Sequence, residues 1–299
     1  MRSKLFLKMK THPDGSFDKW KARIVAGGDS QDQSEYKLEE TSSPTVALWS
    51  VFCIAAMRKR GSVIRTMDIK SAYLNAIINS RELLMRVQPD VAAIMTTLVP
   101  DWQSDLDADG SLVVRLHKAL YGCVESAKLF YEHLRNSLAE IGYQPLKSDP
   151  CVYTKKDKSG KRNIVMTHVD DLHCIFTSEE QAEELQKHLE NKYGTTNLQK
   201  GDEHNFIGMH LTYQDNHSVK ITMDGYVKEL LQEYGIKTTD TARYPASANL
   251  YVTSEFSPIL SEPEQNSFRS RVMKIMYLAI RIRPDLLLTN KLKDYVTRR

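Results

Sequence analysis

Residues 167–176 have the sequence THVDDLHCIF, in which the adjacent aspartates Asp170 and Asp171 lie between two short apolar segments. Those segments predict two strands, and so short a connection predicts a tight hairpin. Two neighbouring carboxylates repel each other unless a cation neutralises them. The pair is therefore either a solvated turn or a Mg²⁺ site, since Mg²⁺ prefers a few carboxylates together with phosphate and water oxygens.

A third carboxylate favours the metal interpretation. Asp68 ends another apolar segment, 62–67, which also predicts a strand. If that strand lies beside the hairpin, the three carboxylates meet at one end of a sheet. Two-metal phosphoryl transfer requires such a grouping of acidic ligands.

The surrounding sequence predicts an antiparallel α+β sheet with helices on one face, because the middle of the chain runs strand, helix, strand, strand, helix, strand. A hairpin is predicted around Pro13-Asp14-Gly15, a loop over 27–43, and an irregular insertion over 88–111. Strands are predicted over 151–155, 163–169, 172–177, 205–213 and 218–223. Helices are predicted over 43–57, 71–78, 126–141, 178–193, 224–234 and 268–282.

The composition is that of a globular chain able to bury a core. Hydrophobic residues make up 41% of the 299 residues, and the net charge of +3 is only mildly basic. No apolar stretch approaches the ~18–20 residues of a membrane span, and the N-terminal sequence is too polar for a secretion signal. Four widely spaced cysteines indicate neither a disulfide framework nor a structural zinc site. We therefore expect neither secretion nor a membrane partner.

Nine segments between about residue 5 and about residue 285 occur in the order and spacing of one family's motifs. They are HPDGSFDKWKARIVAGG (12–28), EETSSPTV (39–46), MDIKSAYLNA (67–76), MRVQP (85–89), LHKALYGCVESAKLFYEHL (116–134), SDPCVYTKK (148–156), HVDDL (168–172), NFIGMHL (205–211) and FRSRVMKIMYLAIRIRPD (268–285). In these segments the chain resembles the reverse transcriptase domain of copia-type LTR retrotransposons, a part of their Pol polyprotein.

The resemblance implies a right-hand polymerase fold of the α+β class, with an antiparallel palm sheet, a fingers hairpin and a small helical thumb. The implied parts are fingers (1–60), palm with the first catalytic aspartate (61–86), a fingers and palm insertion with the nucleotide-pocket motif (87–122), palm with the Asp-Asp hairpin and primer grip (123–214), the start of the thumb (215–240), a linker (241–267), and the start of a connection or RNase H tether (268–299).

The implied activity is RNA- and DNA-templated DNA polymerisation, in which a primer 3′-hydroxyl is extended with dNTPs by two-metal phosphoryl transfer. The implied cofactors are two Mg²⁺ ions, with Mn²⁺ as a substitute. The implied partners are an RNA template, a DNA primer or duplex, and the integrase and RNase H domains of the parent polyprotein, which this sequence lacks. The implied location is a cytoplasmic virus-like particle or the nucleus.

Site residues follow from the matched motifs. Asp68, Asp170 and Asp171 match the catalytic metal-binding triad, with the Ile69 carbonyl as a backbone ligand. Residues expected to bind the dNTP are Lys21, Arg23, Tyr73, Tyr121 and Gly122, with Tyr73 as the steric gate against a 2′-hydroxyl. Residues expected to contact primer or template are His168, Val169, Phe206, Ile207, Gly208 and Met209. The alternatives are a core aromatic for Tyr73, a solvated strand face for Lys21 and Arg23, and a core strand for 206–209.

Several positions depart from the family pattern. His168 replaces an aromatic residue, Gly27-Gly28-Asp29 replaces a cationic and aromatic segment, and Val124, Glu125 and Ala127 replace Lys, Gln and Pro. Glu125 is expected to put an anion in the path of the nucleic acid. These changes, and the end of the sequence at Arg299, support the alternative of a polyprotein fragment or a catalytically decayed remnant that binds nucleic acid without polymerising. A third alternative is an unrelated palm-like nucleotidyl enzyme such as a cyclase.

Overall fold

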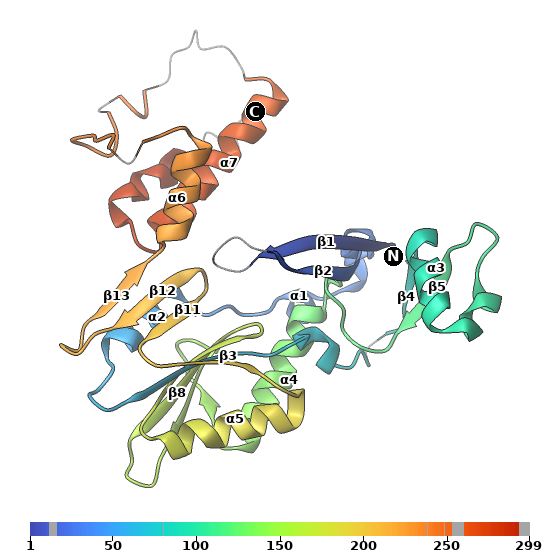
Figure 1. Cartoon of the computed structure of the whole chain (residues 1–299), viewed down its shortest axis with the longest axis horizontal. Helices are drawn as coiled ribbons and strands as arrows, with labels where there is room; N and C mark the ends of the chain where they lie inside the picture. The colour runs from blue at the N-terminus through green and yellow to red at the C-terminus, as the bar shows by residue number, and fades with distance from the viewer. Residues whose placement is uncertain (12–16, 80, 238, 248, 253–259, 293–299) are drawn as a thin grey trace. The chain divides into compact units, whose positions relative to one another are not determined.

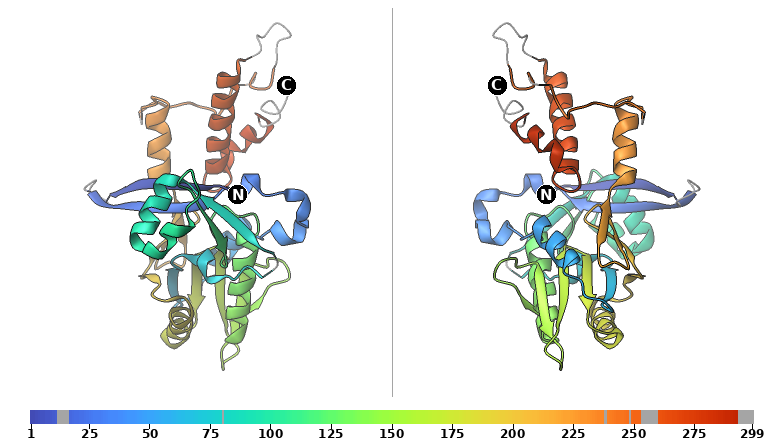
Figure 2. Two further views of the ribbon diagram at one scale, coloured as in Figure 1. Left: turned by 90° about the vertical axis from the view of Figure 1, so that its right-hand side faces the viewer. Right: turned by 90° about the vertical axis from the view of Figure 1, so that its left-hand side faces the viewer.

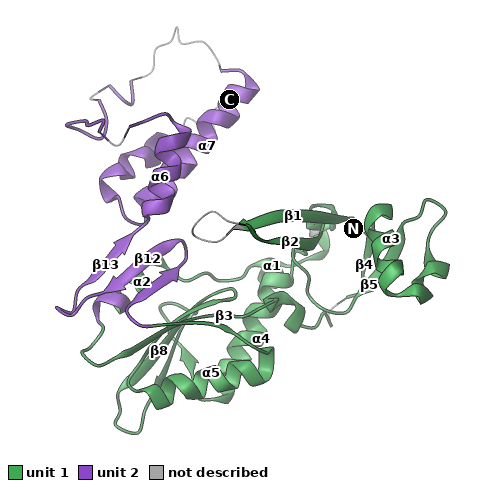
Figure 3. Ribbon diagram, viewed as in Figure 1, with its two compact units in different colours: residues 1–54, 58–200 green, residues 55–57, 201–299 purple. Residues whose placement is uncertain are grey.

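The computed structural model describes residues 1–11, 17–79, 81–237, 239–247, 249–252 and 260–292. The chain forms two compact units, shown in separate colours in Figure 3. Unit 1 comprises residues 1–54 and 58–200, and unit 2 comprises residues 55–57 and 201–299. Each unit has its own antiparallel sheet, which confirms the predicted α+β class.

Unit 1 is built on a six-stranded antiparallel sheet with the strand order β10-β3-β9-β8-β7-β6. Figure 1 labels β3 and β8 of this sheet, with α4 and α5 beside it. Its strands are β3 (Val63–Asp68), β6 (Gln144–Pro145), β7 (Val152–Lys156), β8 (Arg162–His168), β9 (Asp171–Phe176) and β10 (Asn197–Lys200). The three strands predicted between residues 151 and 177 are confirmed. The short edge strand β10 is an addition, because its sequence is too polar to have predicted a strand.

Two helices, α4 (Ser126–Glu140) and α5 (Glu179–Tyr193), supply apolar side chains to the core beneath this sheet. Both are confirmed predictions, and the Ser178 side chain caps α5 by accepting a hydrogen bond from the Gln181 backbone N–H. Met67 and Leu172 belong to the same core. Because side chains alternate along a strand, their neighbours Asp68 and Asp171 lie on the sheet face away from this core.

A two-stranded ribbon, β1 (Ser3–Thr11) with β2 (Phe17–Ala26), forms a long arm of unit 1 (Figure 2). The predicted turn at Pro13-Asp14-Gly15 lies outside the described residues. Lys8 pairs with Lys21, so these two side chains share one face, and Met9 pairs with Trp20 on the other. All four side chains are exposed.

The segment 88–111, expected to be irregular, contains helix α3 (Pro89–Leu98) and the 3₁₀ helix η4 (Pro100–Asp105). This prediction was wrong because Pro89 does not break the chain but begins a helix at its first position, where proline needs no hydrogen-bond donor. Val91 and Ala92, on one side of α3, are buried. The helix follows β4 (Leu83–Val87), which pairs with β5 (Leu112–Leu116).

Three further local predictions for unit 1 need correction. The loop predicted over 27–43 contains η1 (Gly28–Ser30), η2 (Gln33–Glu35) and α1 (Leu38–Thr41). The helix predicted from Ser43-Pro44 begins later, as α2 (Leu48–Ala56). The short helix predicted over 71–78 is only a 3₁₀ helix, η3 (Ala72–Asn75), because Ser71 adopts a left-handed φ of 53° and interrupts regular helix geometry.

Unit 2 holds a three-stranded antiparallel sheet, β11 (Glu203–Phe206), β12 (Met209–Tyr213) and β13 (Val219–Thr222), followed by α6 (Asp224–Glu233), α7 (Glu262–Ala279) and η5 (Pro284–Leu288). The strand predicted over 205–213 is in fact two strands, because the chain reverses at Ile207-Gly208. Helix α7 begins inside the predicted linker, since Ser261 and Glu264 form a capping box there. No helix in the described ranges is long and apolar enough to cross a bilayer.

Candidate active site

The three predicted catalytic aspartates meet at one end of the unit 1 sheet. Asp68, the last residue of β3, is the register partner of Asp171, the first residue of β9. Asp170 lies in the β8–β9 turn, and its carbonyl accepts a hydrogen bond of 3.0 Å from the Ile69 backbone N–H. Antiparallel pairing therefore joins carboxylates that are about a hundred residues apart in the sequence. The strand that ends at Asp68 lies beside the Asp170-Asp171 hairpin, as the sequence analysis expected.

The turn that carries Asp170 has an unusual backbone. His168 pairs with Asp171, so the turn consists of Val169 and Asp170 alone. Val169 has a φ of 57°, a left-handed conformation that β-branched residues rarely adopt. Such backbone conformations persist only where surrounding contacts impose them, and they concentrate at functional sites.

Burial and mutual repulsion raise the pKa of two of these carboxyls. Burial is the main cause of the raised pKa of Asp171, about 6, and the charges of Asp170 and Asp68 add to it. Burial also raises the pKa of Asp170, as does Asp68, whereas His168 and Arg23 act in the opposite direction. The site therefore concentrates negative charge that the nearby cations neutralise only in part.

These residues suit a divalent cation in their chemistry. Carboxylate oxygens are the ligands that Mg²⁺ and Mn²⁺ prefer, and a cation would relieve the repulsion that raises the pKa of Asp171. In the part of the chain that the structure describes, no three or more His, Cys, Asp or Glu side chains lie in a group that could hold a metal ion. The paired Asp68 and Asp171 carboxylates, with Asp170 beside them, are the donors available for such an ion.

Asn197 is a site residue that sequence analysis missed. It is the register partner of Asp68 on the other side of β3, and its side-chain amide donates a hydrogen bond of 2.8 Å to an Asp68 carboxylate oxygen. That bond orients the carboxylate and leaves its second oxygen available. No local signal marks Asn197, because its position depends on β10 adding to the sheet edge.

Two tyrosines and an arginine lie near the aspartates. The rings of Tyr73 and Tyr121 are 4.5 Å apart, and the Arg23 guanidinium carbon is 5.7 Å from the Tyr121 ring centre. Burial raises the pKa of both tyrosines, and the Asp170 charge raises it further. Tyr73 also contacts the core ring of Phe130, so the core-aromatic alternative describes part of its surroundings, while the charge of Asp170 acts on its hydroxyl.

Gly122 is required by a close approach of two backbone segments. It has a φ of 94°, and a Cβ there would lie 2.0 Å from the Ala26 carbonyl oxygen. The Ala26 N–H donates to the Tyr121 carbonyl at 2.8 Å. The backbone that Gly122 admits in this structure is therefore that of β2, and the contact fixes Tyr121 to the strand carrying Arg23.

Lys21 lies farther along the ribbon than Arg23 and makes no ion pair with any carboxylate in the described ranges. Its cross-strand partner is Lys8, and like charges directly opposite each other weaken a strand pair. A ribbon that keeps this arrangement on an exposed face is suited to an anionic ligand.

The predicted primer-contacting residues are divided between the units. His168 and Val169 lie at the aspartate turn in unit 1, whereas residues 206–209 form the β11–β12 turn of unit 2. Phe206 and Met209 are each 1% exposed, so the core-strand alternative describes them. Only Ile207 and Gly208 occupy the turn itself.

Glu125 does not present its charge as the sequence suggested. It is 3% exposed, and its two carboxylate oxygens accept hydrogen bonds from the Gln31 amide (3.1 Å) and the Tyr36 hydroxyl (3.3 Å). Gln31 in turn accepts from the Val124 backbone N–H at 2.9 Å. The carboxylate therefore fastens the segment 28–41 to the start of α4, which corrects the expectation of an exposed anion in the nucleic-acid path.

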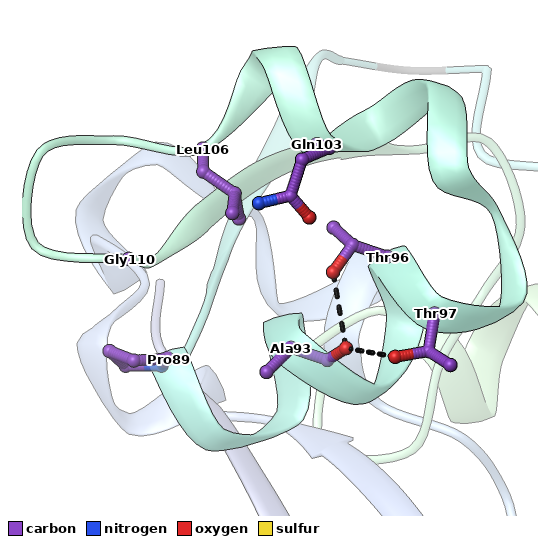
Figure 4. Close-up of a pocket in the computed structure, with 7 residues that line it drawn as sticks. All are labelled: Pro89, Ala93, Thr96, Thr97, Gln103, Leu106 and Gly110. Carbon is purple, nitrogen blue, oxygen red and sulfur yellow. Dashed lines mark hydrogen bonds between the residues drawn. The ribbon is translucent and has the colours of Figure 1, made fainter.

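A separate cavity of about 330 Å³ lies between α3 and the loop after η4 (Figure 4). It is lined by Pro89, Ala93, Thr96, Thr97, Gln103, Leu106 and Gly110. The Thr96 and Thr97 hydroxyls both donate to the Ala93 carbonyl. These seven residues include none of the predicted site residues and no ionisable side chain, so the cavity has no groups for phosphoryl transfer.

The sequence of residues 4–248 matches the family model described as reverse transcriptase (RNA-dependent DNA polymerase). The chain belongs to the reverse transcriptase family. The match includes every predicted site residue and confirms the resemblance to copia-type retrotransposon domains, together with the polymerase fold class that it implied.

Similar proteins include retrovirus-related Pol polyproteins of two plant transposons. The Nicotiana tabacum TNT 1-94 polyprotein is 22% identical over 96% of this chain and 21% of its own length. The Arabidopsis thaliana RE2 polyprotein is 26% identical over 96% of this chain and 18% of its own length. The chain thus spans about a fifth of these relatives. Among solved structures, a foamy viral protease-reverse transcriptase in complex with double-stranded DNA matches 90% of this chain and 37% of its own, with 12% identity and a TM-score of 0.41.

Proposed function

We propose that this reverse transcriptase domain extends a primer 3′-hydroxyl with dNTPs on an RNA or DNA template, with two Mg²⁺ ions or Mn²⁺ in their place. The observation that carries the proposal is the pairing of Asp68 with Asp171 beside Asp170, on the face of the sheet away from the helix-packed core. When bound there, the two ions would activate the 3′-hydroxyl and stabilise the leaving phosphate oxygens.

The chain's own residues position the reactants. Asp68, Asp170 and Asp171 supply anionic ligands, the Ile69 carbonyl is a fourth ligand in this proposal, and Asn197 holds the Asp68 carboxylate. Most of the catalytic effect in phosphoryl transfer comes from such positioning and from charge neutralisation.

Tyr73, Tyr121 and Arg23 form the proposed dNTP pocket. Arg23 lies over Tyr121 and acts on Asp170 electrostatically, so a triphosphate bound between them would meet a planar cation suited to paired phosphate contacts. Tyr73 contacts both Tyr121 and Phe130, and in this proposal it would exclude a 2′-hydroxyl. Gly122 preserves this pocket by allowing β2 to lie against Tyr121. Lys21 and the other ribbon lysines would contact phosphates.

Primer extension on an RNA template with dNTPs and Mg²⁺ or Mn²⁺ tests the proposal. The test compares wild type with Asp170→Asn/Asp171→Asn and with a matched control, Asp101→Asn/Asp105→Asn, which removes the same charge from exposed positions of η4. We expect extension by wild type and control and none by the site variant. If the folded wild type binds primer–template without extending it, the alternative of a decayed nucleic-acid-binding remnant is favoured. The observation that supports this alternative is His168, which replaces the family's aromatic residue and pairs with Asp171.

A further inference from the structure

The turn between β11 and β12 has a backbone that its sequence does not favour. Phe206 pairs with Met209, so Ile207 and Gly208 alone connect the strands, with φ values of 44° and 81°. A two-residue hairpin turn with positive φ at both positions is of type I′, which usually selects Asn or Gly. Ile207 is β-branched and resists this conformation, so contacts from outside the hairpin must maintain it.

Those contacts come from the C-terminal turn of α7 and from the residues directly after it. The Tyr277 hydroxyl and the Arg281 Nε both donate to the Ile207 carbonyl, at 3.5 Å and 3.3 Å. The Tyr277 hydroxyl also lies 2.2 Å from the place where a Gly208 Cβ would be, so any larger residue there would displace Tyr277. The turn is therefore bound through the Ile207 carbonyl, and the Tyr277 hydroxyl covers Gly208.

The two contacting side chains are themselves fixed. Tyr277 and Arg281 are four residues apart, one helical turn, and the Arg281 guanidinium lies over the Tyr277 ring at 3.6 Å from its centre. Arg281 also donates to the Tyr277 carbonyl at 3.3 Å. On its other flank Tyr277 meets Tyr226 of α6, with ring centres 5.1 Å apart. The Arg281 guanidinium is thus stacked on the Tyr277 ring, and both side chains donate to the Ile207 carbonyl.

We infer that Tyr277 and Arg281 are positioning residues for the Ile207–Gly208 turn, and that the polymerase's primer-binding apparatus extends beyond residue 248, where the family match ends, to Arg281. The inference rests on the proposed function, because that function makes this turn a primer contact. It assigns α7 a role within polymerisation, in addition to any role in connecting to a following domain.

The test uses the full chain with two variants and a matched control for each. Arg281→Met removes the guanidinium from the turn, and Arg271→Met removes the same group from α7 at a site where it lies over Tyr234 instead. Tyr277→Phe removes the hydroxyl from the turn, and Tyr226→Phe removes a hydroxyl that donates to the Lys274 carbonyl. Hydrogen exchange of the Gly208 and Met209 amides, primer–template affinity, and the KM for dNTP are measured for each.

We expect Arg281→Met and Tyr277→Phe to speed exchange of the turn amides and to weaken primer–template binding, each by about fivefold, the effect of losing one hydrogen bond. The KM for dNTP should stay within about twofold, and both controls should behave as wild type, because their contacts do not reach the turn. A merely structural role would not separate primer affinity from the KM for dNTP.

Unchanged exchange would overturn the inference, and so would faster exchange with unchanged primer–template affinity. Failure of the proposed function is a different result. A wild type that binds primer–template without extending it contradicts the proposed polymerisation alone, because the exchange and affinity measurements still decide the role of Tyr277 and Arg281. A wild type that does not bind primer–template contradicts both.

Discussion

Asp68 and Asp171 face each other across the antiparallel strands β3 and β9, the last residue of one strand opposite the first of the other. This pairing sets two anions side by side on one face of the sheet, with Asp170 next in the chain. Without a cation the arrangement destabilises the folded chain, and with one it becomes a binding site. The stability of the domain should therefore respond to pH and to divalent ions.

Asp171→Asn should stabilise the metal-free protein near neutral pH. The folded protein holds the pKa of Asp171 at about 6, above its ordinary value of 3.8, so ionisation costs more when folded than when unfolded. Stability relative to the variant is thus lost as pH rises from about 4 to about 6. Because Asp171 is only half-buried, the expected difference at pH 7 is about 1 kcal/mol.

Urea denaturation of both proteins between pH 4 and pH 8 measures this difference. Adding Mg²⁺ at pH 7 should stabilise the wild type more than the variant, because a bound ion favours the ionised carboxylates. A difference in unfolding free energy that does not change with pH would contradict the assignment of repulsion to Asp171.

Asn197→Ala should weaken metal use with little effect on folding. The Asn197 amide holds one Asp68 oxygen at 2.8 Å, and a carboxylate released from that bond must be ordered again when an ion binds. We expect the Mg²⁺ concentration for half-maximal primer extension to rise by about three- to tenfold. Asn197→Asp replaces this hydrogen-bond donor with a second anion beside Asp68. We expect this variant to lower the free energy of unfolding in the absence of metal. An unaltered Mg²⁺ requirement in Asn197→Ala would remove Asn197 from the site.

Gly122→Ala should destabilise unit 1 by more than about 3 kcal/mol, because the new Cβ meets the Ala26 carbonyl oxygen at 2.0 Å and the backbone φ is 94°. Gly160→Ala is the matched control: its φ is 79°, but nothing lies within 4 Å of its Cβ position. That variant should lose only about 1 kcal/mol, the cost of the left-handed conformation. Similar losses in urea denaturation would show that backbone conformation, and not the contact with β2, makes Gly122 necessary.

Glu125→Gln should not improve nucleic-acid binding, even though it restores the family's usual residue. The Glu125 carboxylate is buried and accepts from Gln31 and Tyr36, so an amide in its place turns one acceptor into a donor. We expect a loss of about 1 kcal/mol in unfolding free energy and a primer–template affinity within about twofold of wild type. A tenfold gain in primer–template affinity, measured by fluorescence anisotropy, would show that the Glu125 charge does oppose nucleic-acid binding.

Lys8→Gln/Lys21→Gln should lower the salt dependence of primer–template binding. If each lysine contacts one phosphate, the slope of log affinity against log salt should fall in magnitude by about 1.4 on a single strand or about 1.8 on a duplex. The pair is like-charged and directly opposed, so the ribbon should lose no stability. Lys158→Gln/Lys161→Gln, in the β7–β8 turn, removes the same charge and should leave the slope unchanged.

Much of the site could be predicted from sequence because its parts carry local signals. Asp170 and Asp171 lie between apolar strands, and Asp68 ends another, so the period-two pattern alone places each carboxylate at a strand end. Helical spacing of apolar residues and helix-capping signals likewise predicted α4 and α5. Where the sequence analysis failed, the signal was ambiguous: Pro89 begins a helix as readily as it interrupts one, and Ile207 occupies a turn position that usually selects Asn or Gly.

The sequence by itself determined the family, the α+β class and the positions of the three aspartates at or beside strand ends, because periodicity and motif order are properties of the chain alone. Only the tertiary structure decided which residues meet. It brought Asn197 to Asp68, buried Glu125 against Gln31, required Gly122 to make room for β2, and set Arg281 on the Ile207 carbonyl. These contacts join residues far apart in sequence, and pairing over such distances depends on packing of the whole unit, which no local pattern encodes.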